Sequence, residues 1–456
     1  MSQATIDKDF ILTVKMAIER MDVSFLREAM DELHPADIAE VLDAVNMEEA
    51  KSLYRLLEDE KAAEVMMELE EDVREKFLEA LSSKQIAEKV IENIETDDAA
   101  DLLGELSEEK KAEVLSHVED PEHASDIVQL LTYDEDKAGA LMGTELVKVN
   151  VDWTVTRAVR EMRKQGEEVS DVFTVYVVDD KDQLLGSLSF KRLFFSASSM
   201  RNTIRDLFVE KELRSVTPDT DAEEVVKVMK KYDLVVLPVV NEAGRLLGRI
   251  TIDDVVDFMQ EEAERDYAMA SGISQKVESD DSVWLLTRAR LPWLLIGLLG
   301  GILVAQVIAI YEEQLQVDPK LAFFIPLIAA MGGNVGVQSS AIVVQGLANK
   351  SLVAHDIFKR LLKELGVALL NGAICALLLL GFNFLFSTSM ELSYTVSIAL
   401  FSVIIFAGLF GTFIPLALDK FKIDPALATG PFITTMNDIV GLVIYFWVGS
   451  MMYGLG

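Results

Sequence analysis

Long apolar runs dominate the C-terminal part of the chain. A helix needs about 20 mainly apolar residues to cross a hydrocarbon core of roughly 30 Å. Five stretches after Arg290 reach that length with few or no charged side chains, and they cover Leu291–Tyr311, Leu321–Ala348, Leu365–Phe386, Leu392–Leu418 and Pro425–Gly456. We therefore predict five membrane-spanning helices within residues 287–456.

A shorter periodicity runs through residues 30–130. The pattern Ala, polar, any residue, apolar recurs at intervals of about 12 residues or twice that, for example at Ala39–Leu42, Ala63–Met66 and Ala100–Leu103. Hydroxyl and acidic residues precede several of these runs, as in "TDDAADLL", and such residues favour helix starts. The repeat predicts short amphipathic helices stacked as a superhelix. Residues 1–130 are accordingly expected to form an all-α domain without a catalytic constellation.

A second repeat, of mixed α/β character, lies within residues 131–260. Tyr176–Leu193 matches Leu237–Val255, and the alignment places Val177 on Val239. Each copy predicts the order strand, helix, strand, glycine turn, strand, helix. The tandem resembles a pair of CBS domains, which are modules that regulate a neighbouring domain and often bind adenine nucleotides.

The CBS resemblance implies at most one complete nucleotide site in this chain. Thr251 and Asp254 match the Thr-x-x-Asp at which CBS modules contact ribose, whereas Ser189 and Arg192 stand at the same places in the first copy and depart from it. The resemblance therefore implies ATP or a related nucleotide at the second copy. A purely structural tandem is the alternative.

Charge is strongly segregated along the chain. The protein has 76 acidic and 42 basic residues, a net charge of −34, and yet 50% of its residues are apolar. The whole surplus lies in residues 1–285, because residues 286–456 carry nine residues of each sign. Such an acidic chain lacks the basic footprint that nucleic-acid binding needs, and it attracts cations. Cys375 is the only cysteine, so a disulfide framework and a thiolate metal site are both excluded.

Acidic side chains crowd the segment between the tandem and the first span. A run of this kind is usually a solvated helix face. Like charges, however, repel one another within roughly 8–10 Å at physiological salt, so compact docking around them requires counter-cations. We predict that divalent cations bind among Asp253, Asp254, Asp257, Glu261, Glu262, Glu264 and Asp266.

Asp438 is the only Asp, Glu, Lys, Arg or His that we place inside a predicted span. A carboxylate at mid-bilayer costs on the order of 3 kcal/mol or more unless it faces water or a partner, so Asp438 is a candidate functional residue. A protonated carboxyl used for helix packing is the alternative. Asp424, at the start of the same span, is either a helix cap before Pro425 or an ion site at the mouth of a pore.

Small and polar residues interrupt the apolar pattern of the second span at Gly333, Asn334 and Gln338. Polar groups at this depth indicate a wet cavity. Closely spaced glycines also let helices approach one another, and both interpretations can hold together. Because Mg²⁺ keeps several waters and is usually held by one or two carboxylates, we expect a symmetric dimer that brings two Asp438 side chains to one axis.

The basic residues of the loops predict the orientation, because cytoplasmic loops carry the excess of Lys and Arg. The chain also begins without the apolar core of a secretory signal. We expect a multi-pass plasma-membrane protein with a cytoplasmic N-terminus and an outside C-terminus. The basic residues that indicate this are Arg288, Arg290, Lys350, Lys359, Arg360, Lys363, Lys420 and Lys422.

Taken together, the chain resembles the MgtE family of magnesium channels over essentially its whole length. The matching motifs are "AGALM" at Ala138–Met142, "GGNVGVQSS" in the second span, "KELG" at Lys363–Gly366, "DPAL" at Asp424–Leu427, and Asp438 followed by "IVGLVIYF". The resemblance implies a helical N domain, tandem CBS domains, a plug helix in residues 261–286 and a five-helix membrane domain that forms a homodimeric pore.

The same resemblance implies roles for individual residues. Asp438 would hold hydrated Mg²⁺ in the pore, and Mg²⁺ bound by the acidic cytosolic residues would close the gate. Thr434 and Gly430 lie one and two helical turns before Asp438 on one face, and Gly430 departs from a polar residue found in some members. The implied pore-lining set is Gly333, Asn334, Gln338, Gly430, Thr434 and Asn437.

The sequence thus predicts a Mg²⁺ channel and no enzymatic activity. An inside-negative potential is worth about 2.3 kcal/mol per charge per 100 mV, so inward flow needs no ATP-driven pump. A carrier for Mn²⁺, Co²⁺ or Zn²⁺ is one alternative, disfavoured because the spans contain no histidine and soft metals prefer imidazole or thiolate. An intramembrane aspartyl enzyme would require two carboxylates in one site. A nucleotide-sensing scaffold would leave Asp438 without a role.

Overall fold

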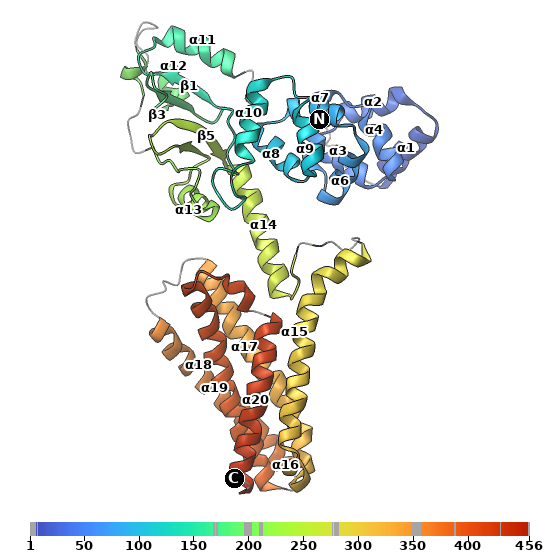
Figure 1. The fold of residues 1–456 in the computed structure, drawn as a ribbon, viewed down its shortest axis with the longest axis vertical. Coiled ribbons are helices and arrows are strands. Elements are labelled where there is room, and N and C mark those ends of the chain that lie inside the picture. The colour runs from blue at the N-terminus through green and yellow to red at the C-terminus, as the bar shows by residue number, and fades with distance from the viewer. Residues whose placement is uncertain are drawn as a thin grey trace. The chain divides into compact units, whose positions relative to one another are not determined.

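We describe the protein from a computed structural model. The chain divides into two compact units, an N-terminal unit of Met1–Met259 and a C-terminal unit of Gln260–Gly456 (Figure 1). The structure describes residues 6, 8–166, 169, 172–195, 203–208, 213–275, 277, 282–348, 357–386, 389–428 and 430–454. Lys350, which contributed to the predicted orientation, lies outside these residues.

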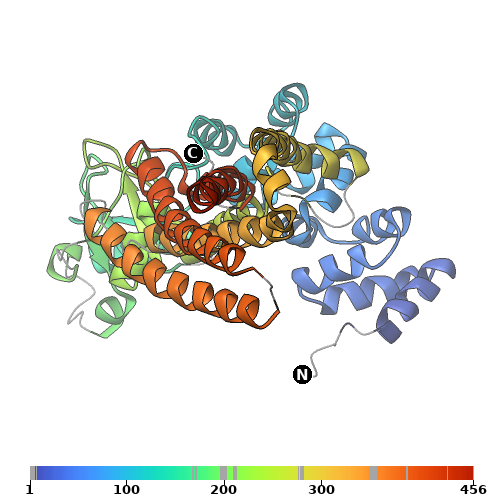
Figure 2. The same ribbon diagram turned by 90° about the horizontal axis from the view of Figure 1, so that it is seen from below.

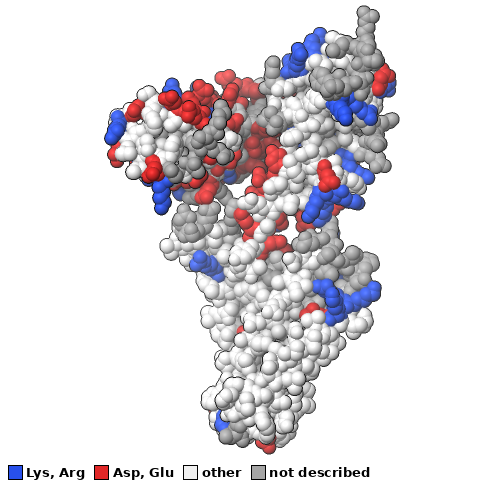
Figure 3. All heavy atoms as spheres, turned by 180° about the vertical axis from the view of Figure 1, so that it is seen from behind, with Lys and Arg blue, Asp and Glu red and all other residues white. Residues whose placement is uncertain are grey.

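The two units differ in surface charge as the sequence predicts. In Figure 3 the acidic side chains gather on the N-terminal unit, whereas the visible face of the C-terminal unit is mostly uncharged. The two parts of the chain are therefore suited to different solvents, water and lipid.

Short helices form the first part of the N-terminal unit, as predicted. Most alanines of the repeat lie in their core, since Ala50, Ala63 and Ala87 are buried, whereas Ala112 near its end is exposed. The helices are α1 (Lys8–Glu19), α2 (Val23–Glu32), α3 (Pro35–Asp43), α4 (Met47–Tyr54), α5 (Asp59–Glu68), α6 (Glu71–Ala80), α7 (Ser83–Lys89), α8 (Thr96–Gly104), α9 (Glu108–Leu115) and α10 (Pro121–Leu130), with a 3-10 turn η1 (Ile91–Asn93).

Local capping explains why so many short helices begin where they do. Asn46 and Glu49 form a reciprocal capping box at the start of α4, and Ser82 and Gln85 form another at the start of α7. Each box satisfies two backbone N–H groups that the first helical turn would otherwise leave unpaired. Burial of the alanine faces then holds the helices together.

The CBS tandem forms two small sheets with equivalent registers. In the first copy β1 pairs in parallel with β2, and β2 pairs antiparallel with β3; in the second, β4 pairs antiparallel with β5. Val177 lies opposite Gly186 and Val239 lies opposite Gly248, so the aligned residues occupy equivalent positions. The elements are β1 (Val147–Asn150), α11 (Val155–Gln165), β2 (Val175–Val178), β3 (Leu184–Leu188), α12 (Phe190–Phe195), η2 (Ile204–Asp206), α13 (Ala222–Tyr232), β4 (Val236–Val240) and β5 (Leu246–Thr251).

The second copy departs from the prediction at its first strand. Val216 makes a single parallel bridge to Val239, so one residue stands where β1 stands in the first copy. One continuous helix, α14 (Ile252–Ala270), follows β5 and leads into the C-terminal unit.

Five helices of the C-terminal unit are long and apolar enough to cross a membrane, which agrees with the predicted number among the described residues. Three of them begin earlier than predicted, because polar residues extend the helix beyond the apolar stretch, whereas the second and the fifth begin at Ile325 and Gly430, after the predicted Leu321 and Pro425. The elements are α15 (Val283–Ile310), α16 (Glu312–Val317), η3 (Pro319–Phe324), α17 (Ile325–Ala348), α18 (Ile357–Phe386), α19 (Met390–Lys420), η5 (Pro425–Ala428) and α20 (Gly430–Tyr453).

Helix α19 packs against α17, α18 and α20, while α15 packs against α20 (Figure 2). Glycines set the closest approaches. A Cβ atom on Gly411 of α19 would lie 2.4 Å from the carbonyl oxygen of Gly336 on α17. The small residues of α17 thus serve helix packing, one of the two predicted uses, and α17 remains an uninterrupted α-helix.

Candidate ion pathway and candidate metal centre

A cavity of about 410 Å³ lies between α17 and α20. Gly333, Asn334 and Gln338 line it from α17, and Thr434 and Asp438 line it from α20. Four of the six residues predicted to line a pore therefore share one cavity with the predicted ion ligand, Asp438, in a single chain. Ala329, Ala330 and Val337 complete its wall. The second predicted use of the polar stretch in α17, lining a cavity, is thus also found.

Asp438 is half-buried beside this cavity. A Cβ atom on Gly333 would lie 3.1 Å from the Thr434 methyl group and 3.8 Å from Asp438 Oδ1, so the glycine lets α17 pass close to the carboxylate. Thr434 donates its hydroxyl hydrogen to the carbonyl of Gly430 at 3.0 Å, which fixes its side chain along α20. Asn334 and Gln338 are exposed in the single chain. Their amides need water or another protein surface at this depth, because lipid cannot hydrogen-bond to them.

Asn437 does not line the cavity, contrary to its place in the predicted set. It is 1% exposed and packs against Gly336, where its amide has no hydrogen-bond partner among the described residues. The reason is helical geometry: Asn437 is rotated by about 100° from Asp438, so it points into the contact between α17 and α20.

Gly430 also lies outside the cavity. It begins α20 with a positive φ of 53°, and a Cβ atom there would lie 2.6 Å from the carbonyl oxygen of Ala270. Glycine is therefore required by the backbone and by the close approach of the end of α14. Next to it, a Cβ atom on Gly272 would meet Pro431 at 2.8 Å.

Asp424, the other predicted ion residue near the last membrane-spanning helix, is exposed. Its Oδ1 accepts a hydrogen bond from the backbone N–H of Ala426 at 2.8 Å, at the start of η5. The structure thus shows the capping arrangement that was one of its two predicted roles.

A second carboxylate belongs to the helical bundle. The predicted third span begins after Glu364, but α18 already includes this residue, and Glu364 Oε1 accepts a hydrogen bond from Ser339 Oγ at 2.7 Å. Apolar length alone could not find this contact, because the neighbouring Lys359, Arg360 and Lys363 end the apolar run.

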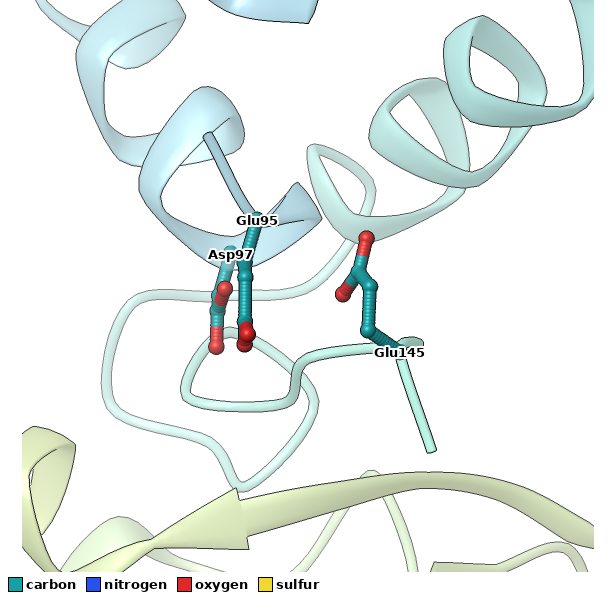
Figure 4. A group of neighbouring side chains, drawn as sticks. All are labelled: Glu95, Asp97 and Glu145. Carbon is teal, nitrogen blue, oxygen red and sulfur yellow. The ribbon is translucent and has the colours of Figure 1, made fainter. Parts of the chain in front are cut away.

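Three carboxylates of the N-terminal unit form a candidate metal centre that the sequence did not indicate. Glu95, Asp97 and Glu145 each place one oxygen within 4.8 Å of the others. Glu95 and Asp97 come from the start of α8, and Glu145 approaches from the segment that precedes β1 (Figure 4). All the donors are hard oxygen ligands, which suit Mg²⁺ and Ca²⁺.

Hydrogen bonds hold this cluster in place. Glu145 accepts from the Thr96 backbone N–H at 3.1 Å and from the Thr96 hydroxyl at 3.0 Å. Asp97 Oδ1 accepts from the Asp98 N–H at 3.1 Å. A Cβ atom on Gly143 would lie 2.8 Å from Asp97 Oδ2, so this glycine makes room for the carboxylate.

The surroundings of the cluster oppose its negative charge. Burial, followed by the charges of Asp254 and Asp98, raises the pKa of Asp97 well above its ordinary value. Burial, and then Asp254, raises the pKa of Asp98 to about 7. Burial also raises the pKa values of Glu145 and Asp254. Carboxylates that are this reluctant to ionise together gain from a bound divalent cation, which neutralises the repulsion.

The predicted acidic residues divide into two groups along α14. Asp254 lies close enough to the cluster for its charge to add to burial in raising the pKa of Asp98. Asp253 and Asp257 lie next to it on the same helix. Glu262, which pairs with Arg265 at 2.6 Å, and Glu264, which accepts from Gln260 at 3.1 Å, engage neighbours on α14 itself. Glu261 and Asp266 belong to the same later part of this helix.

The sequence offered one signal for the metal centre that it missed, the adjacent Asp97 and Asp98 at the start of α8. Acidic residues are common at an ordinary helix start, so this pair did not stand out.

The predicted nucleotide pair lies at the start of α14. The hydroxyl and backbone N–H groups of Thr251 both donate to Asp254 Oδ2, the latter at 2.9 Å. Thr251 is 6% exposed. The pair is therefore preformed as a helix cap, with a carboxylate positioned to accept further hydrogen bonds.

Comparison with known proteins supports the organisation described above. A family model for MgtE, described as a divalent cation transporter, matches residues 325–448, one for the MgtE intracellular N domain matches residues 33–136, and one for CBS domains matches residues 138–198 and 204–261. The magnesium transporter MgtE of Thermus thermophilus is 33% identical over 449 residues, which are 98% of this chain and 99% of that protein. The chain belongs to the MgtE family.

Other MgtE proteins agree with this assignment. The magnesium transporter MgtE of Bacillus subtilis is 33% identical over 327 residues, 72% of each chain. The crystal structure of the soluble part of a magnesium transporter is 28% identical, covers 56% of this chain and 99% of its own, and has a TM-score of 0.51. The cytosolic domain of the Mg²⁺ channel MgtE in complex with ATP is 33% identical, covers 54% and 99%, and has a TM-score of 0.50. The protein is thus a multi-pass membrane protein of a transporter family.

The raised carboxyl pKa values predict how the stability of this MgtE chain depends on pH. Without divalent cations, folded Asp98 keeps its proton up to about pH 7, whereas an unfolded aspartate loses it near 3.8. Because the folded state then binds more protons, this residue's contribution to the free energy of unfolding falls as pH rises from about 4 to about 7. We expect Asp98→Asn to raise the thermal unfolding midpoint of the full-length protein more at pH 8 than at pH 5 in the presence of a chelator. An equal effect at both pH values would contradict this assignment.

Proposed function

We propose that the protein mediates Mg²⁺ uptake down the electrochemical gradient through a pore lined by α17 and α20. The observation that carries this proposal is the cavity in which Asp438 lies with Asn334, Gln338 and Thr434 between two membrane-spanning helices. An anionic oxygen among neutral amide and hydroxyl groups suits a hydrated hard cation, because the waters bound to the ion donate hydrogen bonds to such oxygens.

We propose that two chains complete this pore. In the single chain, Asn334 and Gln338 are exposed, and one Asp438 supplies one negative charge against the two positive charges of the ion. A two-fold axis beside the cavity would cover the exposed amides and bring a second carboxylate to the ion. Chemical cross-linking and mass measurement of the detergent-solubilised protein test the dimer.

The orientation proposed from the loops places the N-terminal unit in the cytoplasm and the C-terminus outside the plasma membrane. Arg288 and Arg290 in α15, Lys359 and Arg360 in α18, and Lys420 at the end of α19 support it. A divalent ion that enters such a cell gains roughly 4.6 kcal/mol per 100 mV, twice the gain of a single charge.

We propose that the Glu95–Asp97–Glu145 cluster, together with Asp254, senses cytoplasmic Mg²⁺. Bound Mg²⁺ would hold α8, the segment of Glu145 and the start of α14 together. When Mg²⁺ leaves, the uncompensated carboxylates repel one another, and this contact loosens. Mg²⁺ thereby favours the compact shape, which requires a higher affinity for that shape than for the loosened one.

Helix α14 is the proposed connection between the sensor and the pore. It begins next to Thr251, and its last residue, Ala270, meets Gly430 at the start of the pore helix α20. Beyond α14, the N–H and hydroxyl groups of Ser274 donate to the carbonyl of Ala289 in α15 at 3.0 and 2.8 Å. Movement of α14 would therefore act directly on the first turn of α20.

Flux into liposomes tests the function and its main alternative, a coupled carrier for Mn²⁺ or Co²⁺. We expect the reconstituted protein to admit Mg²⁺ in response to an inside-negative potential, with discrete single-channel currents and no accompanying proton movement. Proton-coupled flux without such currents would instead support the carrier.

We also propose that the CBS tandem binds an adenine nucleotide, with Thr251 and Asp254 placed for the ribose. Support comes from the preformed Thr251–Asp254 pair and from the ATP complex of the related cytosolic domain. Calorimetric titration of the full-length protein with ATP tests this binding, and the absence of heat would remove the nucleotide from the mechanism.

A further inference from the structure

A buried arginine lies against the candidate metal centre. Arg249 on β5 is 5% exposed, and its Nη2 donates to both carboxylate oxygens of Glu95, at 3.1 and 3.0 Å. Arginine remains charged at every physiological pH, so the guanidinium presents a permanent positive charge to Glu95. The bond joins residues 154 positions apart in the sequence and links the start of α8 to the CBS tandem.

The backbone fixes Arg249 relative to the other ligands of the centre. Its N–H donates to the Gly143 carbonyl at 2.9 Å, and the Gly143 N–H donates back to the Arg249 carbonyl at 2.9 Å. Gly143 is two residues from Glu145 and makes room for Asp97. The ring of Phe173 lies 5.9 Å from the guanidinium carbon. The backbone of Arg249 therefore cannot move away from Gly143 without breaking this paired contact.

The guanidinium and a metal ion would need the same ligand. A divalent cation held by the three carboxylates requires an oxygen of Glu95, and both oxygens of Glu95 already accept hydrogen bonds from Arg249. A guanidinium and a divalent cation that share one carboxylate also repel each other. We propose that Arg249 is a tethered counter-cation that competes with Mg²⁺ for Glu95 and thereby sets the Mg²⁺ concentration at which the N-terminal unit compacts. This inference rests on the proposed Mg²⁺ sensing by the same cluster.

Competition of this kind means that Arg249 stabilises the ion-free contact between α8 and β5 but weakens Mg²⁺ binding. With Mg²⁺ absent, Arg249 offsets part of the carboxylate repulsion and keeps α8 bound to β5. With Mg²⁺ present, Arg249 opposes the incoming ion and raises the concentration needed for binding. Removing the guanidinium should therefore loosen the ion-free form and tighten Mg²⁺ binding in the same variant, a combination that simple loss of folding stability does not produce.

The test is a Mg²⁺ titration of the full-length protein in nanodiscs at constant ionic strength, followed by hydrogen exchange in residues 90–104 and 138–148. We expect Arg249→Met to reach half of its maximal protection from exchange at an Mg²⁺ concentration about tenfold lower than the wild type needs. A tenfold change corresponds to about 1.4 kcal/mol of binding free energy. In chelator, its exchange in both segments should be faster than in the wild type. Arg249→Gln, which keeps an amide donor to Glu95, should shift in the same direction and serves if the methionine variant does not fold.

Arg245→Met is the matched control, because Arg245 is exposed in the turn before β5 and its loss changes the net charge equally. It should titrate like the wild type. If Arg249→Met and Arg249→Gln keep the wild-type midpoint, or need more Mg²⁺, the competition is refuted while Mg²⁺ sensing stands. If Mg²⁺ protects neither the wild type nor the variants, the proposed sensing itself is refuted, and the inference with it.

Discussion

Replacing Asp438 by asparagine is expected to lower Mg²⁺ uptake into liposomes by at least about 100-fold. At an effective dielectric constant near 20, two unit charges 4 Å apart attract by about 4 kcal/mol, and a divalent ion doubles this value. Loss of even a third of that attraction would weaken ion binding in the pore by about 100-fold, since each 1.4 kcal/mol corresponds to a factor of ten in affinity. Asparagine has nearly the same shape, so the packing of Gly333 against Thr434 and Asp438 should persist.

The control for this variant is Asp424→Asn. Asp424 is exposed and caps η5, and an asparagine retains the capping oxygen. We expect it to transport Mg²⁺ at nearly the wild-type rate, with both variants eluting as the wild type does in size-exclusion chromatography. Normal uptake by a correctly assembled Asp438→Asn protein would remove the carboxylate from the conduction mechanism.

Replacing Asp97 by asparagine is expected to flatten the response to cytoplasmic Mg²⁺. Asp97 is 9% exposed, and the neighbouring charges that raise its pKa include Asp254, Asp98 and Glu145. The variant loses a metal ligand and also loses part of the repulsion that loosens the ion-free form. We expect the half-saturating Mg²⁺ concentration for protease protection to rise at least about tenfold, while the ion-free protein becomes more resistant than the wild type.

Asp101→Asn is the matched control on the same helix, since Asp101 is exposed on α8 and outside the carboxylate cluster. It should preserve both the midpoint and the amplitude of the protection. In flux assays, the Asp97 variant should depend less on internal Mg²⁺ than the wild type and the Asp101 variant do. An unchanged midpoint for Asp97→Asn would exclude this cluster as the sensor.

Much of the architecture could be predicted because it depends on neighbouring residues. The number of membrane helices follows from the lengths of the apolar stretches, and the CBS repeat follows from the alignment of Val177 with Val239, which occupy equivalent registers in the two copies. The helix ends were less well predicted. Residues such as Glu364 extend α18 beyond its apolar stretch, and only a partner on α17 explains their presence there.

The candidate sites were predicted unevenly for a related reason. Thr434 and Asp438 could be predicted to share a face because they are one helical turn apart, and both line the cavity between α17 and α20. Asn437 shares the same helix, but its burial against Gly336 depends on how α17 and α20 pack. Gly430 looked like a missing pore ligand, whereas its positive φ and its contact with Ala270 give it a backbone role.

The sequence by itself determined the segregation of charge, the five apolar spans, the two internal repeats and the single carboxylate in the last span. Each of these depends on composition or on the order of nearby residues, because hydrophobic transfer and helical periodicity act locally along the chain. The tertiary structure alone decided that Glu95, Asp97 and Glu145 meet, and that Arg249 pairs with Glu95. Those contacts join residues about 50 and 154 positions apart. Only the packing of α8 against the CBS tandem brings their charges close enough to repel one another or to share a cation.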